Sequence, residues 1–344
     1  MLLNTDFYTP SELTGYARSL AADLPVNRFA LRQWLPSRVI DDLTYRFTRG
    51  GDSLIEAATY RAYDAESRIA SRPGIVRVSG ELPPISMKIM LGEYDQLRRR
   101  ANPVPSVQEA ILGDTDRVVR MIEARLEVAR GAALAYGQVT ISENGFVATV
   151  DYGRSSSCQV VPTTLWSNSA LATPIADLVT WATAYTNLNG EGPGAIVMSK
   201  QARGLIMASA EARGMASLGG TTPSLVTAGA LSTILEANEL PPITTYDVQY
   251  AVNGVSQRVI PAGYVLMLPA AAAPDSFEAT QLGATFSGVT ADAQEADYGL
   301  AGEEAGIVAG VYKTFDPLTF WTRGSAIALP VLVNPNLAFR AAVL

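Results

Sequence analysis

The chain contains no histidine and only one cysteine, Cys158, among its 344 residues. Histidine is the one side chain whose unperturbed pKa lies near neutral pH, and it is the commonest metal ligand in proteins. Its absence excludes Ser-His and Cys-His catalysis together with most zinc sites. The single cysteine cannot form an intrachain disulfide, which is consistent with a reducing compartment. The sequence therefore favours a protein that works through its shape over an enzyme.

Charged residues are also scarce: they make up 17% of the chain, against 48% for hydrophobic residues. Self-association would explain this deficit, because the cores of interfaces are depleted in charge. An alanine-rich composition would explain it equally well. The net charge is −7, and the acidic excess lies in residues 151–344. This balance argues against nonspecific binding of nucleic acid.

No apolar run is long enough to cross a membrane. The most apolar stretch, residues 264–273, spans about ten residues and contains Pro269, whereas a membrane helix needs about 20. The N-terminus lacks the basic region of a signal peptide. We therefore expect a soluble, cytosolic chain, whose length predicts roughly two domains at about 150 residues each.

Three motifs could carry chemistry, and each lacks something that the chemistry requires. The Ser155–Cys158 run offers nucleophiles that no histidine can activate. The Gly190–Gly194 loop precedes a predicted strand instead of a helix, and Pro193 removes an amide that a phosphate would need. An acidic cluster could supply the two carboxylates of a hydrolase, although a solvated loop is the commoner meaning; its members are Asp292, Glu295, Asp297, Glu303 and Glu304. A carboxylate-based hydrolase stays open as a remote alternative, and we expect no catalytic residue, metal or cofactor.

The first 90 residues cannot form a core of their own. Residues 1–42 read as an arm with a short helix near Pro10, and its large apolar residues Phe29 and Trp34 must dock on this subunit or a neighbour. Residues 43–88 read as a strand followed by a projecting hairpin with arms at 54–63 and 75–78. We predict that this hairpin forms ion pairs with adjacent subunits, and a solvated loop is the alternative. Its candidate contact residues are Arg46, Arg49, Arg61, Arg68, Arg72 and Arg77.

The longest predicted helix covers residues 114–136, with Asp114 or Thr115 as its cap. One apolar face recurs at helical spacing, through Val118, Ile122, Leu126, Ala129 and Ala133. Asn-Gly pairs predict two later hairpins, around residues 143–145 and 253–254. Further helices are expected at 172–188, 201–212 and 227–238, strands at 195–198, 264–268, 325–333 and 337–343, and a loop at 288–306.

Taken in order, these pieces resemble the lambda-type major capsid proteins of tailed phages (the major capsid protein E family), which have the Hong Kong 97-like fold. The resemblance covers nearly the whole chain. It is carried by Tyr8–Leu13 and Asn27–Phe47, by Val150–Arg154 and Trp166–Ser167, by Ala195–Met198, Asn253–Gly254 and Val259–Leu266, and by Asp316–Pro317 and Ala326–Pro335.

The resemblance implies an α+β capsid fold with five segments. These are an N-terminal arm (1–42), an extended β-hairpin loop (43–88), a peripheral domain with a long spine helix (89–171), an axial domain (172–304) and returning strands of the peripheral domain (305–344). It also implies hexamers and pentamers in an icosahedral virion shell around double-stranded DNA, assembled in the host cytoplasm with scaffolding, portal and decoration proteins. Covalent crosslinks are not expected, because residues 48–82 contain no lysine and Lys88 lies at the base of the loop. A cellular nanocompartment shell of the same fold is the alternative.

Overall fold

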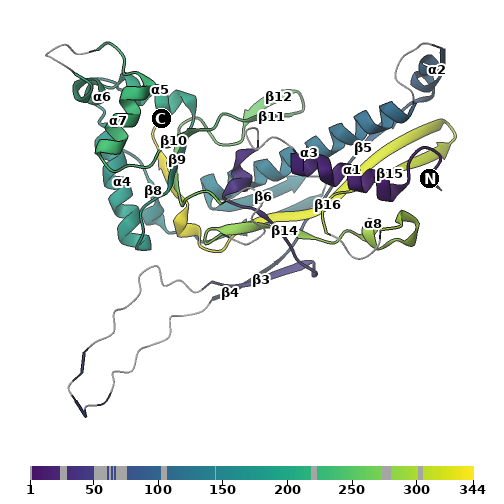
Figure 1. Cartoon of the computed structure of the whole chain (residues 1–344), viewed down its shortest axis with the longest axis horizontal. Coiled ribbons are helices and arrows are strands. Elements are labelled where there is room, and N and C mark those ends of the chain that lie inside the picture. The colour runs from purple at the N-terminus through teal and green to yellow at the C-terminus, as the bar shows by residue number, and fades with distance from the viewer. Residues whose placement is uncertain are drawn as a thin grey trace.

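The computed structural model describes residues 2–23, 29–49, 60–61, 63–64, 66, 76–101, 107–143, 145–217, 223–272, 280–300 and 305–344. These residues form an elongated molecule with two lobes (Figure 1). One lobe is built on a six-stranded sheet, and the other surrounds a five-stranded sheet. The expected α+β class is confirmed.

The six-stranded sheet is organised around one long strand, β16 (Leu318–Leu332). Strand β5 pairs antiparallel with one edge of β16. Strands β15 and β14 pair antiparallel with successive parts of the opposite edge. Two short strands, β1 and β2, then border β15 and β14. The bounds are β1 (Leu2–Leu3), β2 (Ser37–Val39), β5 (Pro84–Leu91), β14 (Gly283–Gly288) and β15 (Val308–Phe315). Segments from both ends of the chain therefore meet in this sheet.

The long helix α3 (Val107–Tyr136) packs along this sheet and confirms the predicted apolar face. Val118 and Ile122 are each 1% exposed. The helix begins seven residues before the predicted cap at Asp114, because buried Ala110 and Ile111 extend the same apolar face upstream. Asp114 instead pairs with Arg117 at 3.2 Å.

The contact between α3 and β16 depends on a glycine. A Cβ atom on Gly324 would lie 2.5 Å from Val118 Cγ1, so no side chain fits without moving the helix. We expect Gly324→Val to lower the free energy of unfolding by about 1–3 kcal/mol through overpacking, as measured by urea unfolding. Gly113→Ala is the matched control on α3, since nothing lies within 4 Å of its Cβ position, and it should be stabilising by about 0.5–1 kcal/mol.

The five-stranded sheet has the order β10-β9-β13-β17-β8. Its strands are β8 (Gln159–Val160), β9 (Ala195–Met198), β10 (Ile243–Thr245), β13 (Tyr264–Leu268) and β17 (Phe339–Ala342). Around it lie α4 (Pro174–Asn189), α5 (Lys200–Ala208), α6 (Ala210–Met215) and α7 (Ala228–Ala237). Helices α4 and α7 and strands β9, β13 and β17 agree with the expected elements. The single helix expected at 201–212 is divided into α5 and α6, and β8 and β10 were not expected.

Sheet membership does not follow the expected segment boundaries. Strand β14 falls inside the expected axial segment 172–304, yet it lies in the six-stranded sheet. Strand β17 falls inside the expected returning segment 305–344, yet it pairs with β13 and β8 in the other sheet.

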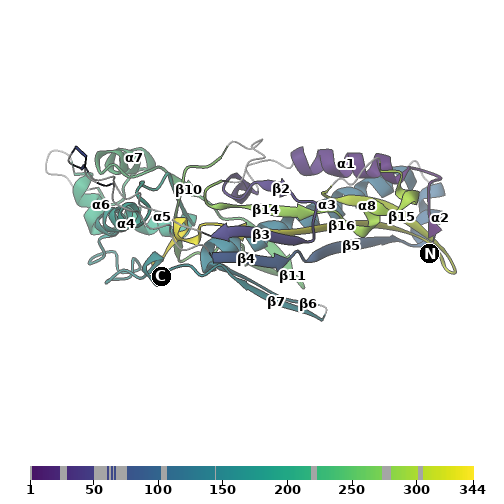
Figure 2. The same ribbon diagram turned by 90° about the horizontal axis from the view of Figure 1, so that it is seen from below.

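Three two-stranded hairpins project from the two lobes (Figures 1 and 2). They are β3 (Thr44–Arg49) with β4 (Val76–Glu81), β6 (Gln138–Glu143) with β7 (Phe146–Asp151), and β11 (Gln249–Val252) with β12 (Val255–Arg258). The last two match the predicted Asn-Gly hairpins, with Gly145, Asn253 and Gly254 at positive φ. The first differs from the prediction: residues 75–78 were expected to pair with residues 54–63, but β4 pairs with β3. Residues 54–59 lie outside the described residues.

The remaining elements are short. Helix α1 (Pro10–Asp23) starts with a capping box, in which the Thr9 amide donates to Glu12 Oε2 at 2.8 Å and the Glu12 amide donates to Thr9 Oγ1 at 3.3 Å. Residues 288–306 were expected to form a loop, but they contain the short helices α8 (Ala291–Gln294) and η3 (Ala296–Tyr298). The others are α2 (Glu93–Ala101), η1 (Ala30–Gln33), η2 (Ser156–Cys158) and η4 (Pro335–Leu337).

Candidate interaction surfaces

The candidate arginines of residues 43–88 are only partly within the described residues. Arg68 and Arg72 lie outside them, and for Arg49 and Arg77 only the strand positions, at the open end of the β3–β4 hairpin, are described. Arg46 and Arg61 are exposed. Arg46 lies 4.0 Å from Asp42, with the two side chains 77% and 65% exposed, so this contact within the chain contributes little.

The base of the β3–β4 hairpin is fixed to the six-stranded sheet by one aromatic side chain. The Tyr45 ring stacks on Phe286 of β14, with ring centroids 6.2 Å apart, and Tyr45 is 2% exposed. Gly80 on β4 faces the same ring, and a Cβ atom there would lie 2.4 Å from the Tyr45 hydroxyl oxygen. The hairpin is thus attached to the six-stranded sheet at its base.

Two tyrosines farther along this segment are fully exposed. Tyr60 has a relative exposure of 106% and Tyr63 of 100%, so their own chain covers neither ring. Aromatic side chains commonly anchor protein interfaces, where they lose much apolar surface to water. Sequence reasoning concentrated on the arginines and missed these residues, although two tyrosines three positions apart in a segment without a core were a usable signal.

The two aromatic candidates of the arm have different surroundings. Trp34 is 2% exposed, belongs to the main core, and donates its indole N–H to the carbonyl of Pro269 at 3.0 Å. This burial removes Trp34 from the candidate contacts with other subunits, since its ring packs within its own chain. Phe29 is half-exposed and lines a groove of about 930 Å³ beside α3, together with Met121 and Val252.

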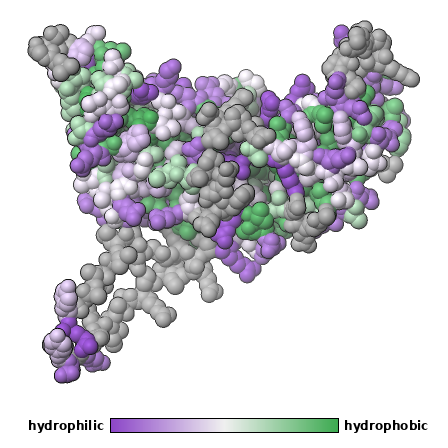
Figure 3. All heavy atoms as spheres, viewed as in Figure 1, coloured by the Kyte–Doolittle hydropathy of each residue, from purple (hydrophilic) through white to green (hydrophobic). Residues whose placement is uncertain are grey.

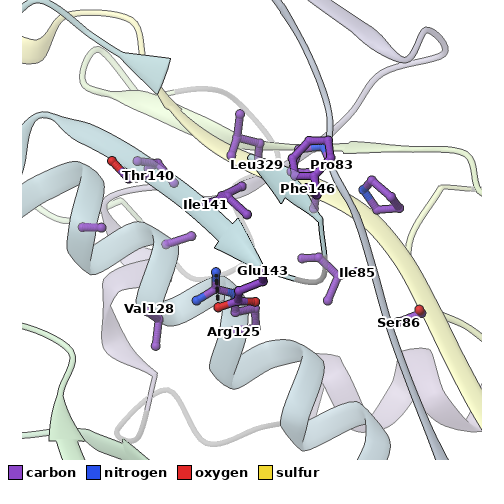
Figure 4. A pocket seen from close by; sticks show the side chains of 15 residues that line it. Pro83, Ile85, Ser86, Arg125, Val128, Thr140, Ile141, Glu143, Phe146 and Leu329 are labelled. Carbon is purple, nitrogen blue, oxygen red and sulfur yellow. Dashed lines mark ion pairs between the residues drawn. The ribbon is translucent and has the colours of Figure 1, made fainter. Parts of the chain in front are cut away.

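A smaller cavity of about 330 Å³ lies between α3, β5 and the β6–β7 hairpin. Its lining is largely apolar, and Arg125 and Glu143 form an ion pair at 3.1 Å beside it (Figure 4). Ser86 and Thr140 also line it, and the one carboxylate among the described lining residues is Glu143, which is paired with Arg125.

Exposed apolar side chains also gather at the end of the six-stranded lobe where α2 lies beside the β15–β16 turn. Gln96 joins the two by donating to the carbonyl of Leu318 at 3.2 Å. The distal patch, as we name it, consists of Tyr94, Leu97, Phe315 and Leu318, which are 73%, 58%, 67% and 38% exposed. Elsewhere on the face seen in Figure 3, hydrophilic and hydrophobic residues are interspersed.

A buried polar junction ties the arm to both lobes. The fully buried Arg130 of α3 contacts Glu127 at 3.2 Å and donates to Thr285 Oγ1 of β14 at 3.0 Å. Glu127 in turn accepts hydrogen bonds from the Leu31 amide of the arm at 3.0 Å and from the Tyr246 hydroxyl, which precedes β11, at 2.7 Å. Burial and the adjacent carboxylate raise the pKa of Tyr246, so this phenol stays a donor.

Arg154, which follows β7, closes the C-terminal end of α3. It donates to the carbonyls of Leu134 and Ala135 at 2.7 Å each, and to that of Ala338 at 2.9 Å. These bonds satisfy carbonyls that a helix end leaves unpaired. Burial, with the nearby charge of Arg340, lowers the pKa of Arg154 to about 10, so the guanidinium stays charged at neutral pH.

Cys158 and Asp292, which were considered for catalysis, are buried or paired within the fold. Cys158 is buried, and burial raises the pKa of its thiol. Asp292 pairs with Arg323 at 3.1 Å and accepts a bond from Ser325, while Glu303 and Glu304 lie outside the described residues. Among the described residues no group of three metal-ligating side chains occurs. No described helix is long and apolar enough to span a membrane.

Comparisons with known proteins give one family match and two structures of similar fold. A family model for phage major capsid protein E matches residues 9–343. A protein assigned as the capsid protein of a prophage in Escherichia coli CFT073 is 15% identical with a TM-score of 0.65, and the match covers 98% of this chain and 99% of that chain. A phage-related protein from Bordetella bronchiseptica RB50 is 12% identical with a TM-score of 0.60, over 95% of each chain. Comparison with curated protein sequences gave no match. The two structures share the fold described above.

Proposed function

The chain belongs to the phage major capsid protein E family, and from this premise we propose that its copies assemble as hexamers and pentamers into the icosahedral head shell of a tailed phage. Its fold is that of Hong Kong 97-like capsid proteins. The family is structural, and we propose that this chain catalyses no reaction. A shell subunit needs several contact surfaces and no turnover, which fits a chain without histidine.

One observation supports the proposed contacts most directly: the extended loop exposes aromatic side chains that its own subunit does not cover. The loop is attached through buried Tyr45 and carries the fully exposed Tyr60 and Tyr63. We propose that it lies over an adjacent subunit and that both tyrosines are buried there. Arg46 and Arg61 would then help to orient the two subunits but would add little to their affinity, because exposed ion pairs contribute little binding free energy.

The two lobes suit different positions in such a shell. We propose that the α4–α7 lobe, which corresponds to the axial segment, surrounds the five- and six-fold axes. The six-stranded lobe would then be peripheral, with the distal patch on a neighbouring capsomer. The contacts between subunits are heterologous, and such contacts produce a closed shell when they close around rotation axes. Phe29 stays a proposed contact, in the groove beside α3.

We propose that the shell is held together without covalent crosslinks. Residues 48–82 contain no lysine, and the Lys88 ammonium lies 4.6 Å from the centroid of the Trp321 ring on the six-stranded sheet. Scaffolding, portal and decoration proteins are the proposed partners, and assembly in the host cytoplasm is the proposed route. The shell would enclose double-stranded DNA without reading its sequence, and the acidic net charge of −7 would keep the affinity of each subunit for phosphates low.

Electron microscopy of the purified protein tests this proposal. We expect closed icosahedral particles or ring-shaped capsomers, and denaturing electrophoresis should return single 36.5 kDa chains because no crosslink forms. A species that stays monomeric at every concentration would contradict the proposal. Particles isolated from the natural source should contain nuclease-protected DNA, whereas an enclosed enzyme would identify a cellular nanocompartment instead.

A further inference from the structure

Two buried carboxylates share one buried arginine where the arm, α3 and the segment before β11 meet. Arg130 Nη1 lies 3.2 Å from Glu127 Oε2 and 3.8 Å from Glu123 Oε2. The side chains of Arg130 and Glu127 are 0% exposed, and that of Glu123 is 12% exposed. Two ionised carboxylates exceed the one positive charge of Arg130 in a region with little solvent, which is unfavourable. Arg32 on η1 opposes this effect without reversing it.

Hydrogen bonding distinguishes the two carboxylates. Glu127 accepts bonds from the Leu31 amide, the Tyr246 hydroxyl and Arg130, and donors of this kind stabilise the ionised form. Among the described residues, none donates a hydrogen bond to Glu123. Glu123 is therefore the carboxyl group of this pair whose ionised form is held by fewer hydrogen bonds.

We propose that Glu123, Glu127 and Arg130 form a proton-responsive junction, in which Glu123 binds one proton as the solution is acidified and so stabilises the folded subunit. The proton adds to a carboxylate oxygen of Glu123, and no covalent bond breaks. Removing the excess charge leaves a neutral Glu127–Arg130 pair with its hydrogen bonds to the arm intact. This proposal does not depend on shell assembly.

The charges around Glu123 agree with this assignment. Burial raises the pKa of Glu123, and Glu127 adds to the effect, while Arg130 on α3 and Arg32 on η1 oppose it. Tyr246, from the segment before β11, faces Glu127. Since the folded-state pKa lies above the ordinary value of 4.5, the folded protein binds this proton more tightly than the unfolded chain. The resulting stability is complete below 4.5 and is lost as the pH rises through the folded-state pKa.

The experiment compares urea unfolding of the full chain and of Glu123→Gln at several values from about pH 8 to about pH 5. Wild type should gain stability on acidification. The variant should be more stable than wild type at the alkaline end, and this difference should shrink as the pH falls. Glu236→Gln, which replaces an exposed glutamate on α7, is the matched control and should follow the wild-type profile.

A second measurement observes the proton itself. In infrared difference spectra between the two pH limits, the carbonyl band of a protonated carboxylic acid should grow in wild type and should be reduced in Glu123→Gln. Retention of the full band in the variant would overturn the assignment, as would pH profiles that run parallel for the variant and wild type. Both readouts can be recorded on unassembled protein, so a failure of the shell proposal would leave them interpretable.

Discussion

Replacing Tyr60 and Tyr63 together with serine is expected to prevent shell assembly while leaving the subunit folded. Both rings are fully exposed on the subunit, so their loss removes no contact within the chain. Aromatic anchors at the centre of an interface typically contribute about 2 kcal/mol each or more. Loss of both corresponds to about a 1,000-fold weaker contact, measured as the concentration at which particles first appear in sedimentation.

The phenylalanine variants provide the control for this prediction. Tyr60→Phe with Tyr63→Phe keeps the apolar area of both rings, and assembly should therefore stay close to that of wild type. Circular dichroism and the melting temperature of the unassembled subunit should be the same for all three proteins. If the serine variant assembles at the wild-type concentration, the proposed burial of the loop on a neighbour is wrong.

Arg130→Met is expected to produce the largest loss of stability in the subunit itself. The substitution preserves most of the side-chain volume and leaves Glu123 and Glu127 buried without their cation. Removing one partner of a buried ion pair typically costs about 3–5 kcal/mol. Urea unfolding of unassembled protein would measure this loss, and the arm should become more sensitive to proteolysis because Leu31 is bonded to Glu127.

Arg120→Met on the same helix isolates the effect of burial. Arg120 forms an ion pair with Asp116 at 2.8 Å, but its side chain is 55% exposed. An exposed pair contributes about 1 kcal/mol at most, so this variant should stay close to wild type. Equal losses from the two substitutions would mean that the Arg130 junction is unimportant for the stability of the fold.

Local patterns in the sequence were sufficient for most elements. The spacing from Val118 to Ala133 identified α3, and the Asn-Gly pairs identified two hairpins. Each of these signals lies within one element, where periodicity and turn chemistry act directly. The family resemblance added the order of the segments, and the family match over residues 9–343 confirms the family.

Long-range pairings could not be read in the same way. The β3–β4 register and the exchange of β14 and β17 between the sheets depend on partners far away in the sequence. The burial of Trp34 and the Glu127–Arg130 junction likewise require knowing which segments meet. A charged residue on a predicted helix is expected to face solvent, so the sequence gave no sign that Glu123 and Glu127 are buried.

The position of β16 and β17 near the end of the sequence constrains when this protein can fold. Strand β16 is the partner of β5, β14 and β15, and β17 lies between β13 and β8. During synthesis, neither sheet can close until residues 318–342 have left the ribosome. Prematurely terminated chains would therefore lack both frameworks, and incomplete subunits would be kept from joining a growing lattice.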